Sequence, residues 1–297
     1  MPDAYLPRRH PVADECVVRG LRTHLTRWPG ADPHPVVLVH GYMDCGDTFQ
    51  FLVDALPDTL SFVAPDLRGF GRSEWPADGY WFPDYFADLD ALLADVSADA
   101  PVTLIGHSMG GNIAMTYAGV RPGRVARLVN IEGFGLPATQ AGDAPERLRE
   151  WLDQLRAPAQ PAVFPSVDAL ARLLCRRHPR LPRERAEFVA AAWTRVDVDG
   201  RAQLRFDPAH KRVNPVLYRR EEAEAYWRGV RSPTLYVLAR DSDYLARIGE
   251  AALPEAMTRL VPQLEACWIE DAGHMVHHEQ PQALAAAIDD FLRRHPL

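Results

Sequence analysis

The chain has almost no lysine and no long apolar run, and each absence removes a class of protein. Lys211 is the only lysine among 297 residues, and no block of like charge occurs in a chain of formal net charge −7. This pattern predicts neither a nucleic-acid surface nor attraction to an anionic membrane. No stretch of about eighteen consecutive apolar residues occurs, so a membrane-spanning helix is not expected.

Cysteine is also scarce, and the four present are scattered without the C-x-x-C spacing of a zinc or redox site. They are Cys16, Cys45, Cys175 and Cys267. We expect free thiols in a reducing compartment, since paired cysteines belong to oxidising ones. Residues 1–20 have no apolar core typical of a signal peptide. The prediction is a cytoplasmic protein without a metal or organic cofactor.

What the sequence does contain is a series of short apolar runs rich in valine, leucine and isoleucine, typical of strands buried on both faces of a parallel sheet. They cover residues 35–39, 61–65, 102–105, 128–131, 234–239 and 266–269. Helical periodicity stands between several of them, at 84–96, 109–120 and 281–292. Residues 15–28 alternate like an antiparallel hairpin turning near Gly20. The fold class predicted is α/β, a doubly wound, mostly parallel sheet with an antiparallel edge.

The alternation of strand and helix stops between the fourth and fifth runs. Helical patterns follow one another there, without a strong strand run, at 145–156, 166–177, 182–194 and 219–230. We therefore expect one core built from residues 1–135 and 231–297, with residues 136–230 inserted as a helical cap. Such a cap would roof the pocket and decide specificity.

A nucleophile is predicted at Ser108, in the sequence GHSMGG at residues 106–111. The segment follows a predicted strand and opens a predicted helix, which is the context of a G-x-S-x-G nucleophile elbow. Small flanking residues let the chain cross closely at such a strained turn. The helix that begins there points its amides and its positive dipole end at the site.

A serine hydroxyl needs a base, and His274 is the candidate, just beyond the last predicted strand. The third member is an acid that should follow the fifth apolar run. Asp243 is favoured because it lies deeper in that loop, where the chain can turn back toward His274; Asp241 is nearer the strand end. Glu132, at the end of the fourth run, is a third candidate.

Acyl transfer also needs donors for the oxyanion that develops on the carbonyl. The backbone N–H of Met109, next to the nucleophile, should be one of them. The other should come from the loop after the first buried strand, where Tyr42 is the expected donor and Met43 the second choice. His40, in the same loop, is expected to bind backbone. A metal site formed by His277, His278 and Glu279 is a minor alternative, because no separate ligand cluster accompanies them.

Together these residues resemble the α/β-hydrolase fold family. His40-Gly41, the loop at 66–73, the elbow at 106–111 and Gly273-His274 occur in the family's order, over residues 15–135 and 231–297. Residues 41–49 are similar to the branch of serine-hydrolase-like proteins. Relatives that place their acid after the fourth strand keep Glu132 among the candidates, and Ala239-Arg240 departs from the usual glycine near Asp243. Serine at position 108 disfavours the dehalogenases and epoxide hydrolases of this fold, which use aspartate there.

The function predicted is a serine hydrolase that cleaves a carboxylic ester or thioester through an acyl-enzyme. The aromatic content of the insertion favours an apolar acyl or aryl group on a small-molecule substrate. Cleavage of a C–C bond, a lactone or an amide by the same triad is an alternative. A slowly turning-over protein that binds a ligand and signals to a partner is another. The oligomeric state is left open.

Overall fold

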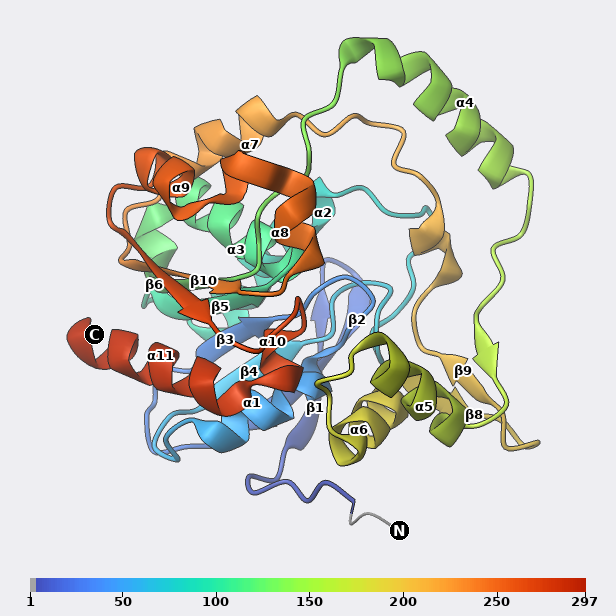
Figure 1. Ribbon diagram of the computed structural model, residues 1–297, viewed down its shortest axis with the longest axis horizontal. Helices are drawn as coiled ribbons and strands as arrows, with labels where there is room; N and C mark the ends of the chain where they lie inside the picture. The colour runs from blue at the N-terminus through green and yellow to red at the C-terminus, as the bar shows by residue number, and fades with distance from the viewer. Residues whose placement is uncertain (1–3) are drawn as a thin grey trace.

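A computed structural model describes residues 4–297 and contains an eight-stranded sheet with the spatial order β1-β2-β4-β3-β5-β6-β10-β11 (Figure 1). The strands are β1 (Val12–Val18), β2 (Leu21–Trp28), β3 (Val36–Val39), β4 (Phe62–Pro65), β5 (Val102–His107), β6 (Val125–Ile131), β10 (Thr234–Ala239) and β11 (Leu264–Ile269). β2 pairs antiparallel with β1 on one side and with β4 on the other. From β4 to β11 in the spatial order, each strand is parallel to its neighbour. The predicted fold class and its antiparallel edge are therefore confirmed.

Helices cover both faces of this sheet, in agreement with the doubly wound prediction. They are α1 (Gln50–Ala55), α2 (Pro83–Val96), α3 (Met109–Val120), α8 (Asp243–Ile248), α9 (Pro254–Leu260), α10 (Val276–Glu279) and α11 (Pro281–Arg294). Residues of β3 show why its run is apolar throughout. Val37 and Val39 face the core shared with α2 and α3, whereas Val36 and Leu38 face the core shared with α1 and α11.

The carboxyl ends of the central strands meet at one edge of the sheet, which is where open α/β sheets place their sites. β5 ends directly before Ser108, and β6 ends directly before Glu132. β10 ends at Ala239, and β11 leads through a short loop to His274. The topology thus brings the ends of four strands, far apart in sequence, into one neighbourhood.

Residues 136–230 stand between β6 and β10, where an insertion was predicted. They contain α4 (Ala144–Leu155), α5 (Val167–Arg177), α6 (Arg183–Trp193), α7 (Arg220–Trp227) and a three-stranded antiparallel sheet of β7 (Val163–Phe164), β8 (Thr194–Val196) and β9 (Ala202–Leu204). The expectation of helices alone was wrong, because strands of two or three residues leave no apolar run to detect. α7 packs on α3, so the boundary of a separate cap at residue 230 stays a prediction.

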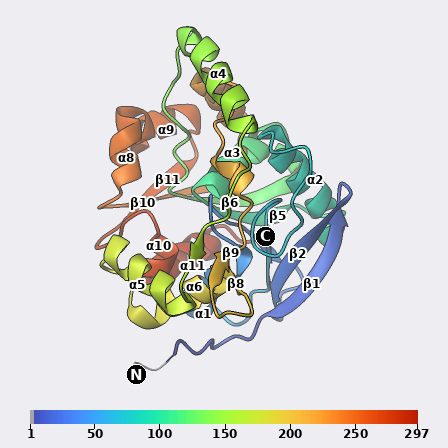
Figure 2. The ribbon, with the colours of Figure 1, turned by 90° about the vertical axis from the view of Figure 1, so that its right-hand side faces the viewer.

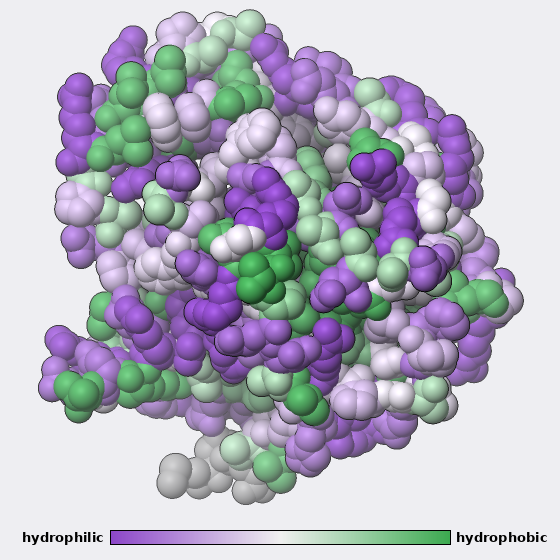
Figure 3. Space-filling view, turned by 180° about the vertical axis from the view of Figure 1, so that it is seen from behind, coloured by the Kyte–Doolittle hydropathy of each residue, from purple (hydrophilic) through white to green (hydrophobic). Residues whose placement is uncertain are grey.

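α4 stands out from the rest of the molecule in two perpendicular views (Figures 1 and 2). None of its residues is buried, and Leu148, Leu152 and Leu155 are exposed along one stripe. Apolar residues gather over this helix at the upper left of Figure 3. Across residues 4–297, no helix combines the length and apolarity that crossing a membrane requires.

Candidate active site

Ser108 sits at a sharp turn between β5 and α3, with φ 53° and ψ −115°. A non-glycine residue in this region costs on the order of 1–3 kcal/mol, so its surroundings must hold it there. The neighbouring glycines allow the close crossing. A Cβ on Gly110 would lie 2.0 Å from the carbonyl oxygen of Val39, and one on Gly106 would lie 2.3 Å from that of Gly110. The predicted tight turn between strand and helix is therefore present at Ser108, and its role as a nucleophile elbow stays a prediction.

His274 contacts Ser108, the candidate nucleophile, directly. Its Nε2 lies 2.8 Å from the Ser108 Oγ, within hydrogen-bonding distance for proton transfer. A hydrogen bond from the residue before Ser108 holds the loop that carries His274: His107 Nε2 donates to the His274 carbonyl at 2.8 Å. The ring of Tyr244 stacks on the His274 imidazole, with centroids 4.1 Å apart and planes 24° apart. Nothing in the sequence pattern singles out this tyrosine.

The carboxylate beside His274 belongs to Glu132. Its Oε2 lies 3.1 Å from His274 Nδ1, and its Oε1 accepts from the Ala239 amide at 2.7 Å. The Ser242 hydroxyl donates to Oε2 as well, and the Glu132 side chain is wholly buried. Because a carboxylate only accepts, Nδ1 carries the imidazole proton and Nε2 presents its lone pair to Ser108. Glu132 itself has φ 56°.

The structure contradicts the placement of Asp243 next to His274. Asp243 is the exposed first residue of α8, and within residues 4–297 it makes no hydrogen bond to the histidine. The chain enters this helix directly after Ser242, whose hydroxyl accepts from the Leu245 amide at 3.4 Å, and this turn leaves Asp243 facing solvent. Asp241 is also displaced, since its carboxylate pairs at 2.6 Å with Arg180 of the insertion.

The loop after β3 lies against Ser108, as the oxyanion prediction requires. A Cβ on Gly41 would lie 3.2 Å from the Ser108 Cβ. In the part of the chain described, the amides of Tyr42 and Met109 donate to no protein acceptor. Met109 opens α3, where the first amides have no partner inside the helix. Both amides are thus available to a ligand, and their role as donors stays a prediction.

His40 binds backbone, as expected from the sequence. Its Nδ1 lies 2.7 Å from the Gly41 carbonyl oxygen, and its Nε2 accepts from the Leu67 amide at 2.9 Å. The side chain is fully buried, and this burial lowers its pKa. A neutral ring held by two backbone groups is a structural support for the loop and not a second base.

The minor metal alternative does not match the observed geometry. His277 and His278 point toward Asp44, while the Glu279 carboxylate accepts from the Gly273 amide at 2.7 Å. A different trio, Asp44, His107 and His277, brings one potential ligand atom from each residue within 4.8 Å of the others. Asp44 pairs with His277 Nε2 at 3.2 Å, whereas the Nδ1 atoms of His107 and His277 have no hydrogen-bond partner among the residues that the structure describes.

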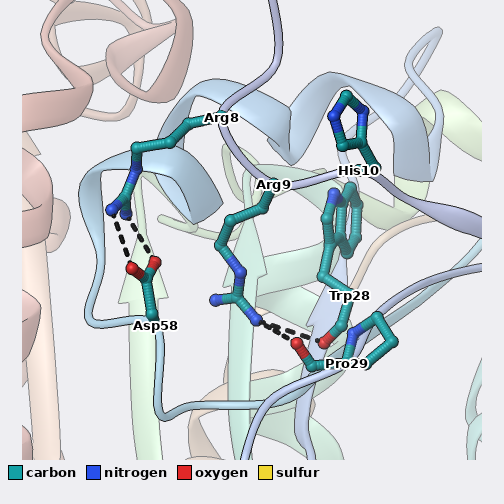
Figure 4. Close-up of a pocket in the computed structure, with 6 residues that line it drawn as sticks. All are labelled: Arg8, Arg9, His10, Trp28, Pro29 and Asp58. Carbon is teal, nitrogen blue, oxygen red and sulfur yellow. Dashed lines mark hydrogen bonds and ion pairs between the residues drawn. The ribbon is translucent and has the colours of Figure 1, made fainter.

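A hollow elsewhere on the surface offers no competing site (Figure 4). It is lined by Arg8, Arg9, His10, Trp28, Pro29 and Asp58. The two guanidinium groups are occupied: one pairs with Asp58 at 3.0 Å, and the other donates to the Pro29 carbonyl at 2.7 Å. None of the candidate catalytic residues lines it.

Comparisons with known proteins identify the family to which this fold belongs. Residues 34–281 match the family described as alpha/beta hydrolase fold. A serine hydrolase-like protein of Danio rerio is 26% identical over 275 residues, which are 90% of this chain and 83% of that protein. A 3-hydroxybutyrate-oligomer hydrolase of Cupriavidus necator is 31% identical over 274 residues, 88% of this chain and 89% of its own length. The solved thioesterase domain from the curacin biosynthetic pathway has a TM-score of 0.82 at 26% identity, covering 94% of this chain and 99% of that domain. The chain therefore belongs to the α/β-hydrolase fold family of hydrolytic enzymes.

Proposed function

We propose that the chain is a serine hydrolase that cleaves a carboxylic ester or thioester through an acyl-enzyme, with Ser108, His274 and Glu132 as its triad. The observation that carries the proposal is the continuous hydrogen-bonded path from Ser108 Oγ to His274 Nε2 and from His274 Nδ1 to Glu132. Each member has the partner that its role demands: a nucleophile with a base, and a base oriented by a buried acid.

In the first half-reaction, His274 Nε2 takes the Ser108 hydroxyl proton as Oγ bonds to the substrate carbonyl carbon. The carbonyl π pair moves onto oxygen, and the Glu132 carboxylate stabilises the imidazolium. The oxyanion then collapses, the bond to the leaving alcohol or thiol breaks, and His274 returns the proton to that group. Water repeats these steps on the acyl-enzyme, so Ser108 leaves and regains its proton.

The amides of Tyr42 and Met109 would hold the oxyanion. They come from the two segments that flank Ser108, the loop after β3 and the first turn of α3. The Tyr42 hydroxyl is engaged elsewhere, because it donates to the His210 carbonyl of the insertion at 2.9 Å. Only its main chain is therefore offered to the substrate. Loss of one such donor typically costs about 100-fold or more in rate.

Residues 136–230 would act as the cap over this site and select an apolar acyl or aryl group. Support comes from their contacts with the catalytic loops: Arg185 donates to the His278 carbonyl at 2.9 Å, and Arg180 pairs with Asp241. Aromatic rings also join the insertion to the core, since His210 of the insertion stacks on Phe70 and Tyr80. The names of two relatives, an oligomer hydrolase and a thioesterase, also favour ester-like substrates.

The test compares probe labelling and turnover of Ser108→Ala with those of the wild type and of Ser97→Ala. Ser97 is the matched control because its hydroxyl donates to the Ala100 carbonyl, away from the triad. A fluorophosphonate probe should label the wild type and Ser97→Ala, and should not label Ser108→Ala. Hydrolysis of p-nitrophenyl esters and acyl thioesters of increasing chain length should fall at least ~1,000-fold in Ser108→Ala alone. Full activity in that variant would disprove the triad. Turnover confined to amides, lactones or C–C bonds would redirect the substrate class.

A further inference from the structure

A second polar cluster lies directly beneath the triad and takes no part in the acyl transfer described above. It consists of Asp44, His107, His277 and His278, all at most 2% exposed. We call it the Asp44 cluster. The His107 ring lies 4.2 Å from the His277 ring, and the His277 ring lies 4.0 Å from the His278 ring, measured between centroids. Burying an ionisable group costs free energy of folding unless the group is paired. Four such groups buried together therefore indicate a role for the cluster.

Asp44 is the charged member and the centre of the hydrogen bonds. Its Oδ1 accepts from the Cys45 amide at 2.9 Å, from the Thr48 hydroxyl at 2.7 Å and from the Trp193 indole N–H at 2.8 Å. Its Oδ2 pairs with His277 Nε2 at 3.2 Å. Burial alone would raise the pKa of Asp44, but the hydrogen bond from His277 and the neighbouring imidazoles outweigh it and hold the pKa well below its usual range.

These partners come from three separate segments. Asp44 belongs to the loop after β3 that carries Tyr42, His277 lies three residues after the candidate base His274, and Trp193 ends α6 of the insertion. One carboxylate therefore ties the predicted oxyanion loop to the histidine loop and to the insertion.

The loop that Asp44 anchors is under backbone strain. Met43, between Tyr42 and Asp44, has φ 61°, which an L-residue with a side chain adopts at a cost of about 1–2 kcal/mol. Strain of this kind persists only where the surroundings over-determine the conformation. The four hydrogen bonds to Asp44, one residue later, supply that constraint.

We infer, on the basis of the proposed acyl transfer, that Asp44 is a positioning residue. It fixes the strained loop so that the Tyr42 amide faces Ser108. Because the Trp193 indole donates to Asp44, this geometry depends on the docked insertion. Asp44 does not touch the substrate. Its effect is transmitted through the Tyr42 amide, which would act on the oxyanion and hence in the transition state. Its loss should therefore weaken transition-state binding and spare binding of the ground state.

The first variant is Asp44→Asn, which preserves size and one carbonyl oxygen while removing the charge. We expect kcat on a p-nitrophenyl ester to fall about 10- to 100-fold with KM changed less than about 3-fold. A trifluoromethyl ketone mimics the tetrahedral intermediate. Its inhibition constant should rise by the same factor by which kcat/KM falls. Fluorophosphonate titration counts the active sites, so a misfolded fraction cannot imitate this result.

The second variant tests the link to the insertion and does not depend on the fold tolerating Asp44→Asn. Trp193→Phe removes the indole N–H and keeps an aromatic ring; we expect kcat/KM and ketone affinity to fall together by about 3- to 10-fold. The matched control is Trp28→Phe on β2, which removes an indole donor to Gln50 at 2.9 Å, away from the triad. The control should stay within about 2-fold of the wild type.

The inference is overturned if Asp44→Asn leaves kcat and ketone affinity unchanged, or if it raises KM alone, which would assign Asp44 to substrate binding. Equal catalytic behaviour of Trp193→Phe and Trp28→Phe would remove the link to the insertion. Failure of the proposed function has a different signature: the wild type itself would resist fluorophosphonate labelling, or Ser108→Ala would keep its activity.

Discussion

Asp66 shows how a single buried carboxyl in the loop after β4 is tuned by its surroundings. Its Oδ1 accepts from the Gly46 amide at 2.7 Å, and its Oδ2 accepts from the Arg72 amide at 2.8 Å. Both bonds favour the charged form, yet burial, with a contribution from the charge of Asp47, raises the pKa of Asp66 to about 7. The side chain is 2% exposed, so desolvation dominates.

This pKa predicts a pH dependence of stability. Between about pH 4 and pH 7 the unfolded chain loses the Asp66 proton while the folded chain keeps it, so stability falls as pH rises. Relative to Asp66→Asn, the wild-type free energy of unfolding should decrease by up to about 1 kcal/mol per pH unit over this window and level off above it. Urea unfolding of both proteins from pH 4 to pH 8 measures the difference. A difference that stays flat or grows with pH would contradict the assignment.

The acid proposed for the triad illustrates what residue patterns can and cannot predict. Ser108 and His274 follow from a motif and from its position after a strand, and the structure brings them together. Choosing the acid required the path of the loop after β10, and a six-residue helix that begins at Asp243 turns that carboxylate into solvent. The position of Glu132 immediately after β6 was the available signal. Nothing in the sequence pattern identified Tyr244, because its contact with His274 depends on that same short helix.

At the scale of elements, the pattern of Val, Leu and Ile predicted the strands because both faces of the sheet are covered. β10 matches its predicted bounds of 234–239, and α3 matches 109–120. The strands β7 to β9 escaped prediction because two or three residues carry no periodicity, and tertiary contacts decide their pairing. The short helix α8 escaped for the same reason.

The contact between α3 and α7 gives a prediction at this scale. A Cβ on Gly119 of α3 would lie 1.9 Å from the carbonyl oxygen of Tyr226 in α7. Gly119→Ala should therefore destabilise the protein by about 2 kcal/mol or more, although alanine in an open helix position would stabilise it by about 1 kcal/mol. Urea unfolding gives both the sign and the size.

Gly123→Ala is the matched control, because a Cβ there meets no atom within 4 Å and Gly123 lies in the turn just after α3. We expect its free energy of unfolding to stay within about 1 kcal/mol of the wild type. If Gly119→Ala were as stable as this control, the close packing of α7 on the core would be wrong.

At the scale of the whole molecule, the sheet edge organises the chemistry. β5, β6 and β11 deliver Ser108, Glu132 and His274, and β10 contributes the Ala239 amide that binds Glu132. The insertion contacts this edge through Arg180, which lies between α5 and α6, and through Arg185 of α6, whereas α4 has no buried residue. The mostly parallel core with its antiparallel edge could be anticipated from the pattern of apolar runs. The docking of the insertion could not, since it depends on individual pairs such as Arg180 with Asp241.

The most direct test of the account compares Glu132→Gln with Asp243→Asn on an activated ester, with active sites counted by fluorophosphonate. Glu132→Gln keeps the size of the side chain but removes the carboxylate that orients His274. We predict that it lowers kcat by roughly 100- to 10,000-fold with little change in KM, while Asp243→Asn stays within about 3-fold of the wild type. The reverse outcome, with Asp243→Asn inactive and Glu132→Gln active, would contradict the triad.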